Sequence, residues 1–254
     1  MRVLACIKRV PITGGRIVLA EDARAINTQH LAFTMSPHEE CGVEEAARLI
    51  EAHKGDSVVL TLGPPEATEQ LRDAMALGID RAIHLQTDGQ EWDGEATAAA
   101  LTDAIRADEA ASGRFDIIFL GNESADSGGF QVGARVAYAL GRPLVTGLKK
   151  VTLDGSSVRC EQEVEGGRDV YVVPLPAVLT VKEGLNLPRY PSVPGRMRAR
   201  SKPVAVSTPA RPASHLELVR LAVPAGQGRR AESLGAGAAA APAVVEMLQK
   251  AGVV

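Results

Sequence analysis

Short apolar runs alternate with longer amphipathic stretches over residues 1–143 of this chain. The apolar runs lack an alternation of inward and outward positions, which is typical of strands buried on both faces of a parallel sheet. Between them, apolar residues recur at helical spacing. Predicted strands cover 2–7, 57–62, 81–85 and 115–120, with a short extra strand at 16–20, and predicted helices begin at Ser36 and cover 66–77, 94–111, 129–140 and 243–251.

This alternation of strands and helices predicts an α/β fold with a doubly wound, mostly parallel, Rossmann-like sheet. After Pro143 the pattern changes to three β-rich segments joined by turns at Asp154-Gly155 and Gly166-Gly167. These segments predict β-hairpins appended to the edge of the sheet. They cover 144–153, 156–165 and 169–181.

The first long helix carries a start signal in its sequence. Ser36 is a favourable N-cap residue, Pro37 suits the first helical position, and Glu39 stands three residues after Ser36. This spacing predicts a capping box, in which the Ser36 hydroxyl accepts from the backbone of Glu39.

The segment after residue 188 differs from the rest in composition. Prolines at 188, 191 and 194 fix the backbone and remove donors, which predicts an extended, exposed loop with Val193 at its apolar tip. Such a stiffened loop suits a docking element for another protein. The sequence therefore divides into an α/β domain at 1–188 and a docking loop with an extended C-terminal arm and terminal helix at 189–254, including a linker-like stretch at 226–242.

Charge is unevenly distributed along the chain. The net charge is −3, which gives no indication of a nucleic-acid-binding protein. Between residues 189 and 230, however, Glu217 is the one acid against nine basic residues. This arm favours an acidic protein partner, and ordinary solvated surface charge is the alternative. The basic residues are Arg189, Arg196, Arg198, Arg200, Lys202, Arg211, Arg220, Arg229 and Arg230.

The cysteines are Cys6, Cys41 and Cys160, which are far apart and form no CxxC pair. Their spacing suggests no zinc or other metal site and fits a reduced, cytoplasmic compartment. The first residues do not read as a signal peptide, and we expect no membrane span.

Three loops are predicted to meet at the carboxyl ends of the parallel strands, where such folds bind nucleotides. They are 5–11, 36–40 and the Gly/Ser-rich turn 121–133, which leads from a strand into a helix. A turn of this kind presents free N–H groups to a phosphate. The chain has no GxGxxG and no GxxxxGK(S/T) motif, so a turn of small residues without a ligand is an equally good interpretation of this loop alone.

The motifs taken together resemble the β subunit of electron-transfer flavoproteins. The resemblance covers about residues 1–205 and rests on six segments. They are IKRVP at 7–11, SPHEECGVEEA at 36–46, GNESADSGGFQVGARVAYALGRP at 121–143, LPAVLT at 175–180, LNLPRY at 185–190 and MRARSKP at 197–203. The chain departs from the family pattern at Ile12, Ser36, His38 and Leu187, and in having Asp126-Ser127-Gly128 in place of three acids.

The resemblance implies a buried adenine nucleotide, which is a structural AMP in the common form of the family. It further implies that the catalytic FAD is held mostly by an α subunit, that a tip around Val193, Pro194, Met197 and Arg198 docks on a partner, and that Glu163 contacts the mobile flavin domain. The implied nucleotide-binding residues are Ala5, Ser36, Pro37, His38, Leu62, Asp126, Ser127, Gly128, Gly129, Phe130, Gln131, Val132 and Gly133.

The implied function is that of a non-enzymatic subunit of a heterodimeric electron carrier. It would accept electrons from acyl-CoA or other flavin dehydrogenases and pass them to an electron-transfer flavoprotein–quinone oxidoreductase or equivalent acceptor, without binding nucleic acid or entering a membrane. One alternative is the electron-bifurcating form of the family, with a second FAD in place of AMP and NADH as donor. A stand-alone adenine-nucleotide-binding α/β module is the other alternative.

Overall fold

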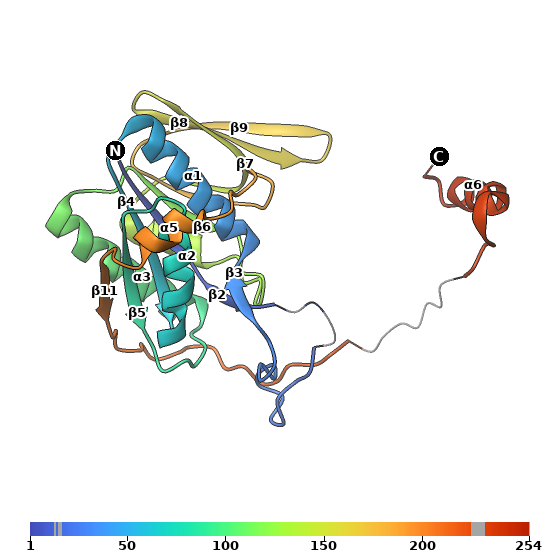
Figure 1. Ribbon diagram of the computed structural model, residues 1–254, viewed down its shortest axis with the longest axis horizontal. Helices are drawn as coiled ribbons and strands as arrows, with labels where there is room; N and C mark the ends of the chain where they lie inside the picture. Colours follow the sequence, from blue (N-terminus) through green and yellow to red (C-terminus); the bar gives the residue numbers. More distant parts are fainter. Residues whose placement is uncertain (13, 15–16, 225–231, 254) are drawn as a thin grey trace.

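The computed structural model describes residues 1–12, 14, 17–224 and 232–253, and its centre is a nine-stranded sheet with the order β11-β5-β4-β1-β6-β10-β7-β8-β9 (Figure 1). The strands from β11 to β7 run parallel, and β8 and β9 continue the sheet as antiparallel strands. A separate antiparallel pair joins β2 to β3. The strands are β1 (Arg2–Ile7), β2 (Arg9–Pro11), β3 (Phe33–Met35), β4 (Asp56–Gly63), β5 (Arg81–Gln86), β6 (Ile117–Gly121), β7 (Leu144–Asp154), β8 (Ser157–Val164), β9 (Gly167–Pro174), β10 (Ala177–Val181) and β11 (Val204–Ser207).

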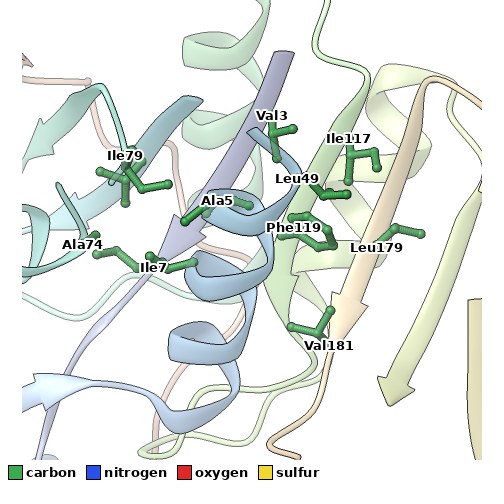
Figure 2. Packing of buried hydrophobic residues seen from close by; sticks show 14 of the residues in the cluster. Val3, Ala5, Ile7, Leu49, Ala74, Ile79, Ile117, Phe119, Leu179 and Val181 are labelled. Atoms are coloured by element: carbon green, nitrogen blue, oxygen red, sulfur yellow. The ribbon is translucent and has the colours of Figure 1, made fainter. Parts of the chain in front are cut away.

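Helices cover both faces of the parallel part of the sheet. Helices α1 and α2 share one buried apolar cluster with Val3, Ala5 and Ile7 of β1, and α3 and α4 share the other cluster with Leu4 and Cys6. Figure 2 shows the first cluster, with α1 lying across β1, β6 and β10. The helices are α1 (Pro37–His53), α2 (Thr68–Ala76), α3 (Gly94–Ser112), α4 (Val132–Leu140), α5 (Val193–Ala199) and α6 (Ala241–Lys250), with 3-10 turns η1 (Pro65–Ala67) and η2 (Gly237–Ala240).

The predicted doubly wound sheet is confirmed. From β1 the chain moves outward through β4 to β5, then returns to place β6 on the other side of β1. The change of direction between β1 and β6 leaves a crevice at their carboxyl ends, because the helices that follow go to opposite faces. This crevice is where the ligand site of such a fold is expected.

The predicted hairpins at the sheet edge are present as β7, β8 and β9, but β10 differs from the prediction. Instead of extending the edge, β10 runs parallel between β6 and β7, in the interior of the sheet. Every residue of β10 is buried, whereas most of β9 is exposed. A strand whose residues are apolar except for Thr180 suits a central place with helices on both sides, and this distinguishes 177–181 from 169–174.

Two further local predictions differ from the structure. The predicted strand at 16–20 includes Arg16, which lies outside the described residues, and the part from residue 17 on contributes an isolated bridge between Leu19 and Ile26. The segment around Val193 is not extended but forms helix α5. Pro194 is tolerated in the first turn, where its missing N–H has no helical partner, and the Ser192 Oγ accepts from the Gly195 N at 3.1 Å.

No helix within the described ranges is long and apolar enough to cross a membrane. The last helix, α6, agrees with the prediction for 243–251 and buries none of its residues. Of the linker-like stretch 226–242, residues 226–231 lie outside the described residues.

Helix α5 depends on a close approach to α2 at Gly195. A Cβ atom at this position would lie 2.6 Å from the carbonyl oxygen of Ala76, which is backbone and cannot turn aside. Gly195→Ala is therefore expected to displace α5 and lower the free energy of unfolding by about 1–3 kcal/mol, the range for overpacking a tight site. Urea denaturation followed by circular dichroism measures this loss.

Gly167→Ala is the matched control for Gly195→Ala, because a Cβ at Gly167 meets nothing within 4 Å. We expect the control to unfold like the original chain. Equal midpoints for the two variants would contradict the proposed packing constraint.

Candidate functional site

A pocket lies at the crevice between the carboxyl ends of β1, β4 and β6. Four segments supply its walls: the end of β1, the end of β4, the loop before α3, and the long turn between β6 and α4. Glu39 of α1 also lines the pocket. The lining residues are Cys6, Ile7, Lys8, Glu39, Leu62, Glu91, Trp92, Gly94, Thr97, Leu101, Leu120, Gly121, Asn122, Glu123, Ser124, Ser127, Gly129, Phe130, Gln131, Val132 and Gly133.

The structure brings about half of the predicted nucleotide-binding residues into this lining. They are Leu62, Ser127, Gly129, Phe130, Gln131, Val132 and Gly133. All but Leu62 come from the turn between β6 and α4, which the sequence singled out because it feeds a helix N-terminus. The turn is shaped by left-handed backbone at Gly128 (φ 57°) and Phe130 (φ 55°).

The other predicted residues lie around the pocket rather than in its lining. Ala5 is buried within β1, and Pro37 is at the first turn of α1. The His38 Nδ1 accepts from the Glu183 N at 2.7 Å, which ties α1 to the segment after β10. Gly128 donates its N–H to the Ser124 oxygen inside the turn, and Asp126 reaches the pocket through Lys8.

Ser36 does not form the predicted capping box. It is fully buried at the start of α1, but its Oγ has no hydrogen-bond partner among the described atoms, and the cap is made by backbone only. The Glu39 Oε2 accepts from the Lys8 N at 2.5 Å. The Glu39 carboxylate thus accepts from a backbone donor after β1, outside its own helix.

Lys8 joins two walls of the pocket. Its Nζ lies 2.5 Å from the Glu91 carboxylate before α3 and 2.8 Å from the Asp126 carboxylate in the turn after β6. Burial alone would lower the pKa of Lys8, but the two carboxylates outweigh it and raise that pKa, while Lys8 lowers the pKa of Asp126 against the effect of burial. The Lys8–Asp126 ion pair is therefore charged at neutral pH.

Glu39 is a buried acid in the pocket. Burial raises its pKa to about 8, against the opposing effect of the Lys8 N–H and ammonium. Gly121 must be glycine beside it, because a Cβ there would lie 2.8 Å from the Glu39 Cγ. The site thus holds a carboxyl group that carries a proton over much of the physiological range.

Helix α4 directs its N-terminus into the same pocket. Gln131, Val132 and Gly133 all line it, and no side chain caps the helix, because the Gln131 side chain instead accepts from Arg135. The first N–H groups of a helix have no partner within the helix and carry a partial positive charge. This end of the pocket suits an anion.

Glu91 and Trp92 were missed as parts of the site. Trp92 is 7% exposed and lies in the pocket wall. The available signal was topological: residues 87–93 follow β5, whose carboxyl end lies at the same edge of the sheet as those of β1 and β6. Three loops were predicted to meet there, and the structure adds this fourth one.

The predicted docking residues lie on helix α5. Val193 and Met197 are 76% and 61% exposed, and Pro194 and Arg198 are exposed beside them. Their placement on one turn-and-a-half of helix presents an apolar tip with basic flanks. Glu163, the predicted flavin-domain contact, is exposed near the end of β8, on the hairpin with β9.

Two of the predicted surface cations, Arg189 and Lys202, instead anchor the segment that contains α5 to the body of the protein. Arg189 contacts Glu44 and Glu51 of α1, with Nε 3.0 Å and Nη1 2.6 Å from the respective carboxylates. Lys202 donates to the carbonyl oxygens of Met75 and Ile79 at the end of α2, at 3.0 and 2.5 Å. Arg196, Arg198 and Arg200 remain exposed, whereas Arg229 and Arg230 lie outside the described residues.

A glutamate with a raised pKa makes folding stability depend on pH in a defined direction. The folded chain holds the Glu39 proton more tightly than the unfolded chain, whose reference value is 4.5, so this contribution is complete below about 4.5 and is lost as pH rises through about 8. Each unit of pKa difference corresponds to about 1.4 kcal/mol. Glu39→Gln is expected to make the decline in unfolding free energy between pH 5 and pH 8 shallower, as measured by urea denaturation.

Glu69→Gln, on the exposed side of α2, is the control for this pH series and should keep the original slope. If Glu39→Gln loses stability with pH as steeply as the original chain, Glu39 does not hold the proton assigned to it.

Across the described residues, no group of three or more His, Cys, Asp or Glu side chains is placed to hold a metal ion.

Comparison with known proteins agrees with this geometry. The family profile described as "Electron transfer flavoprotein domain" matches residues 24–212. The chain is 34% identical to the electron transfer flavoprotein subunit beta of Bacillus subtilis over 80% of this chain and 77% of that one. It is 36% identical to the protein of the same name from Syntrophomonas wolfei, over 88% and 86%, and 33% identical to that from Bradyrhizobium diazoefficiens, over 89% and 91%. This chain therefore belongs to the electron transfer flavoprotein family, as a β-subunit member and hence an electron carrier component.

Proposed function

We propose that this chain pairs with an α subunit, binds AMP in the pocket at the end of β1, and covers part of an FAD held mainly by the α subunit. The heterodimer takes electrons from flavin dehydrogenases, acyl-CoA dehydrogenases among them, and passes them to a quinone oxidoreductase or equivalent acceptor. The observation that carries the proposal is the uncapped α4 N-terminus facing a pocket at the switch between β1 and β6. The FAD supplies the redox chemistry, and the chain supplies binding and orientation.

The residues of the pocket fit an adenine nucleotide. The N–H groups from Gln131 to Gly133 offer donors for the phosphate, as helix N-termini do in other nucleotide sites. The apolar side chains of Leu62 and Leu101 offer a surface for the base, and carboxylates such as Glu123 offer acceptors for ribose hydroxyls. The predicted residues that lie around the lining, Ala5, Ser36, Pro37, His38, Asp126 and Gly128, hold this frame in place.

The proposed division of labour along the chain follows its sequence. Residues 1–188 bind the nucleotide, and 189–254 dock and wrap on partners. Glu163 on the exposed β8–β9 hairpin contacts the flavin domain of the α subunit. Val193, Pro194, Met197 and Arg198 on α5 contact the dehydrogenase, whose complementary surface combines an apolar recess with acidic residues. The buried, free cysteines support a reduced, cytoplasmic location.

The nucleotides released from the purified complex test the identity of the pocket ligand. We expect one FAD and one AMP for each heterodimer, because the pocket provides one anion-binding helix end. Denaturation followed by liquid chromatography and mass spectrometry identifies and counts them. Two FADs would move the assignment to the electron-bifurcating form, and a chain that is isolated alone with one adenine nucleotide would indicate a stand-alone binding module.

Val193→Asp tests the docking role of α5. A charge at the centre of an apolar contact is expected to lower kcat/KM for reduction by a dehydrogenase by about tenfold or more, the effect of losing a central interface residue. Flavin and AMP content should not change, because Val193 is 76% exposed and distant in sequence from the pocket lining. Stopped-flow reduction of the bound flavin provides the measurement.

Val18→Asp introduces the same charge at a valine that is 53% exposed and lies outside both α5 and the C-terminal arm, and it serves as the control. We expect it to accept electrons at the original rate. The docking role would be lost if both variants behaved like the original heterodimer.

A further inference from the structure

After β11 the chain runs back along the body of the protein, past the end of β5 and the loop before α3 (Figure 1). Residues 211–215 contact this loop at 90–95, which forms one wall of the pocket. We propose that Arg211 and Ser214 are positioning residues that fasten this wall and thereby set how long the nucleotide stays bound. The inference rests on the proposed function, since it takes AMP to be the ligand.

Arg211 contacts three consecutive residues of the wall. Its Nη1 donates to the Gln90 Oε1 at 3.2 Å, its Nη2 donates to the Glu91 carbonyl oxygen at 2.7 Å, and its guanidinium carbon lies 5.8 Å from the centre of the Trp92 ring. Two donors and a planar face are used together, which is a geometry that arginine provides and other side chains do not. The contact fixes both the backbone and the aromatic side chain of the wall.

Ser214 secures the other end of the same wall. Its Oγ donates to the Asp93 Oδ2, while the Asp93 Oδ1 accepts from the Ala96 N at 2.7 Å and so caps helix α3. These hydrogen bonds lower the pKa of Asp93, with the bond from the Ala96 backbone as the larger cause. The arm thus binds the residue that sets where the loop ends and the helix begins.

On the pocket side, the cation of Lys8 holds the wall. Glu91 pairs with Lys8, and Lys8 pairs in turn with Asp126 on the opposite wall. Glu91, Trp92 and Gly94 line the pocket, whereas Arg211 and Ser214 contact the outer side of the same segment. A loop held on both sides opens less often than one held on one side, because local opening requires all its contacts to break together.

A ligand buried behind such a wall leaves when the wall opens. Weakening the outer contacts should therefore accelerate release and leave the anion-binding end of α4 unchanged. The expected size is about tenfold in the release rate, the order of one lost hydrogen bond to a charged group. Thermal stability of the nucleotide-free chain should change little, because Arg211 and Ser214 are exposed.

The experiment uses the full chain carrying Arg211→Ala together with Ser214→Ala. The protein is loaded with radiolabelled AMP, chased with an excess of unlabelled AMP, and sampled by rapid filtration. The original chain should release label about tenfold more slowly than the variant. Arg211→Lys, which keeps the charge but not the planar fork, should be intermediate.

The chain has one tryptophan, Trp92, so its fluorescence reports directly on the wall. Acrylamide should quench Trp92 more strongly in the Arg211→Ala, Ser214→Ala variant than in the original chain. Arg220→Ala removes an exposed arginine of the same arm and is the matched control, with release and quenching expected at the original values.

The possible outcomes distinguish the positioning role of Arg211 and Ser214 from the proposed function. If the original chain binds AMP and the variant releases it at the original rate, the positioning role of Arg211 and Ser214 is overturned while the proposed function stands. If the original chain binds no adenine nucleotide, the proposed function is overturned and the positioning role with it. Faster release from Arg220→Ala to the same extent would also overturn the positioning role, since it would show a general effect of the arm's charge.

Discussion

The candidate site depends on how four carboxyl groups are accommodated around one crevice. Glu39, Glu91, Glu123 and Asp126 all lie in or beside the pocket, and unscreened carboxylates so close together would destabilise the folded chain. Lys8 neutralises two of them, and Glu39 avoids its charge by retaining a proton. Because Lys8 follows β1 directly and its partners follow β5 and β6, the same cation that balances the charge also holds together loops from three parallel strands.

The segment proposed to dock on a partner lies in a different part of the molecule and is held by different forces. Helix α5 has seven residues and buries only Gly195 and Ala199, so it has too little apolar contact to hold its own position. Besides the close approach at Gly195, polar anchors at both ends hold it in place: Arg189 on α1, and Lys202 on the carbonyl oxygens of Met75 in α2 and Ile79 just after α2. A helix that is already held rigidly loses less conformational entropy when a partner binds to it. This explains why some cations of the segment, Arg189 and Lys202, contact the body of the protein while others are exposed.

Sequence patterns within single elements predicted the fold and part of the site. They did not predict the interactions between elements. The buried strands β1, β4, β5 and β6 and the Gly/Ser-rich turn before α4 follow from local apolar runs and glycines. The place of β10 in the sheet depends on pairing with strands far away in the sequence. Ser36 and Glu39 matched a capping box, but the nearby Lys8 N–H competed successfully for the carboxylate. Glu91 and Trp92 required knowledge of which loop faces the crevice.

Polar contacts attach the described part of the arm after β11 to the body: Arg211 and Ser214 on the pocket wall, Arg24 with Glu217, and the Leu221 N with the Ala23 oxygen. Apolar side chains of this arm, such as Leu216, Leu218 and Val219, stay exposed. Polar surface contacts are individually weak and exchange readily with water, whereas exposed apolar groups gain free energy when another surface covers them. The arm therefore contacts the pocket wall through polar groups while its exposed apolar side chains are free to be covered, which is what the proposed pairing with an α subunit requires.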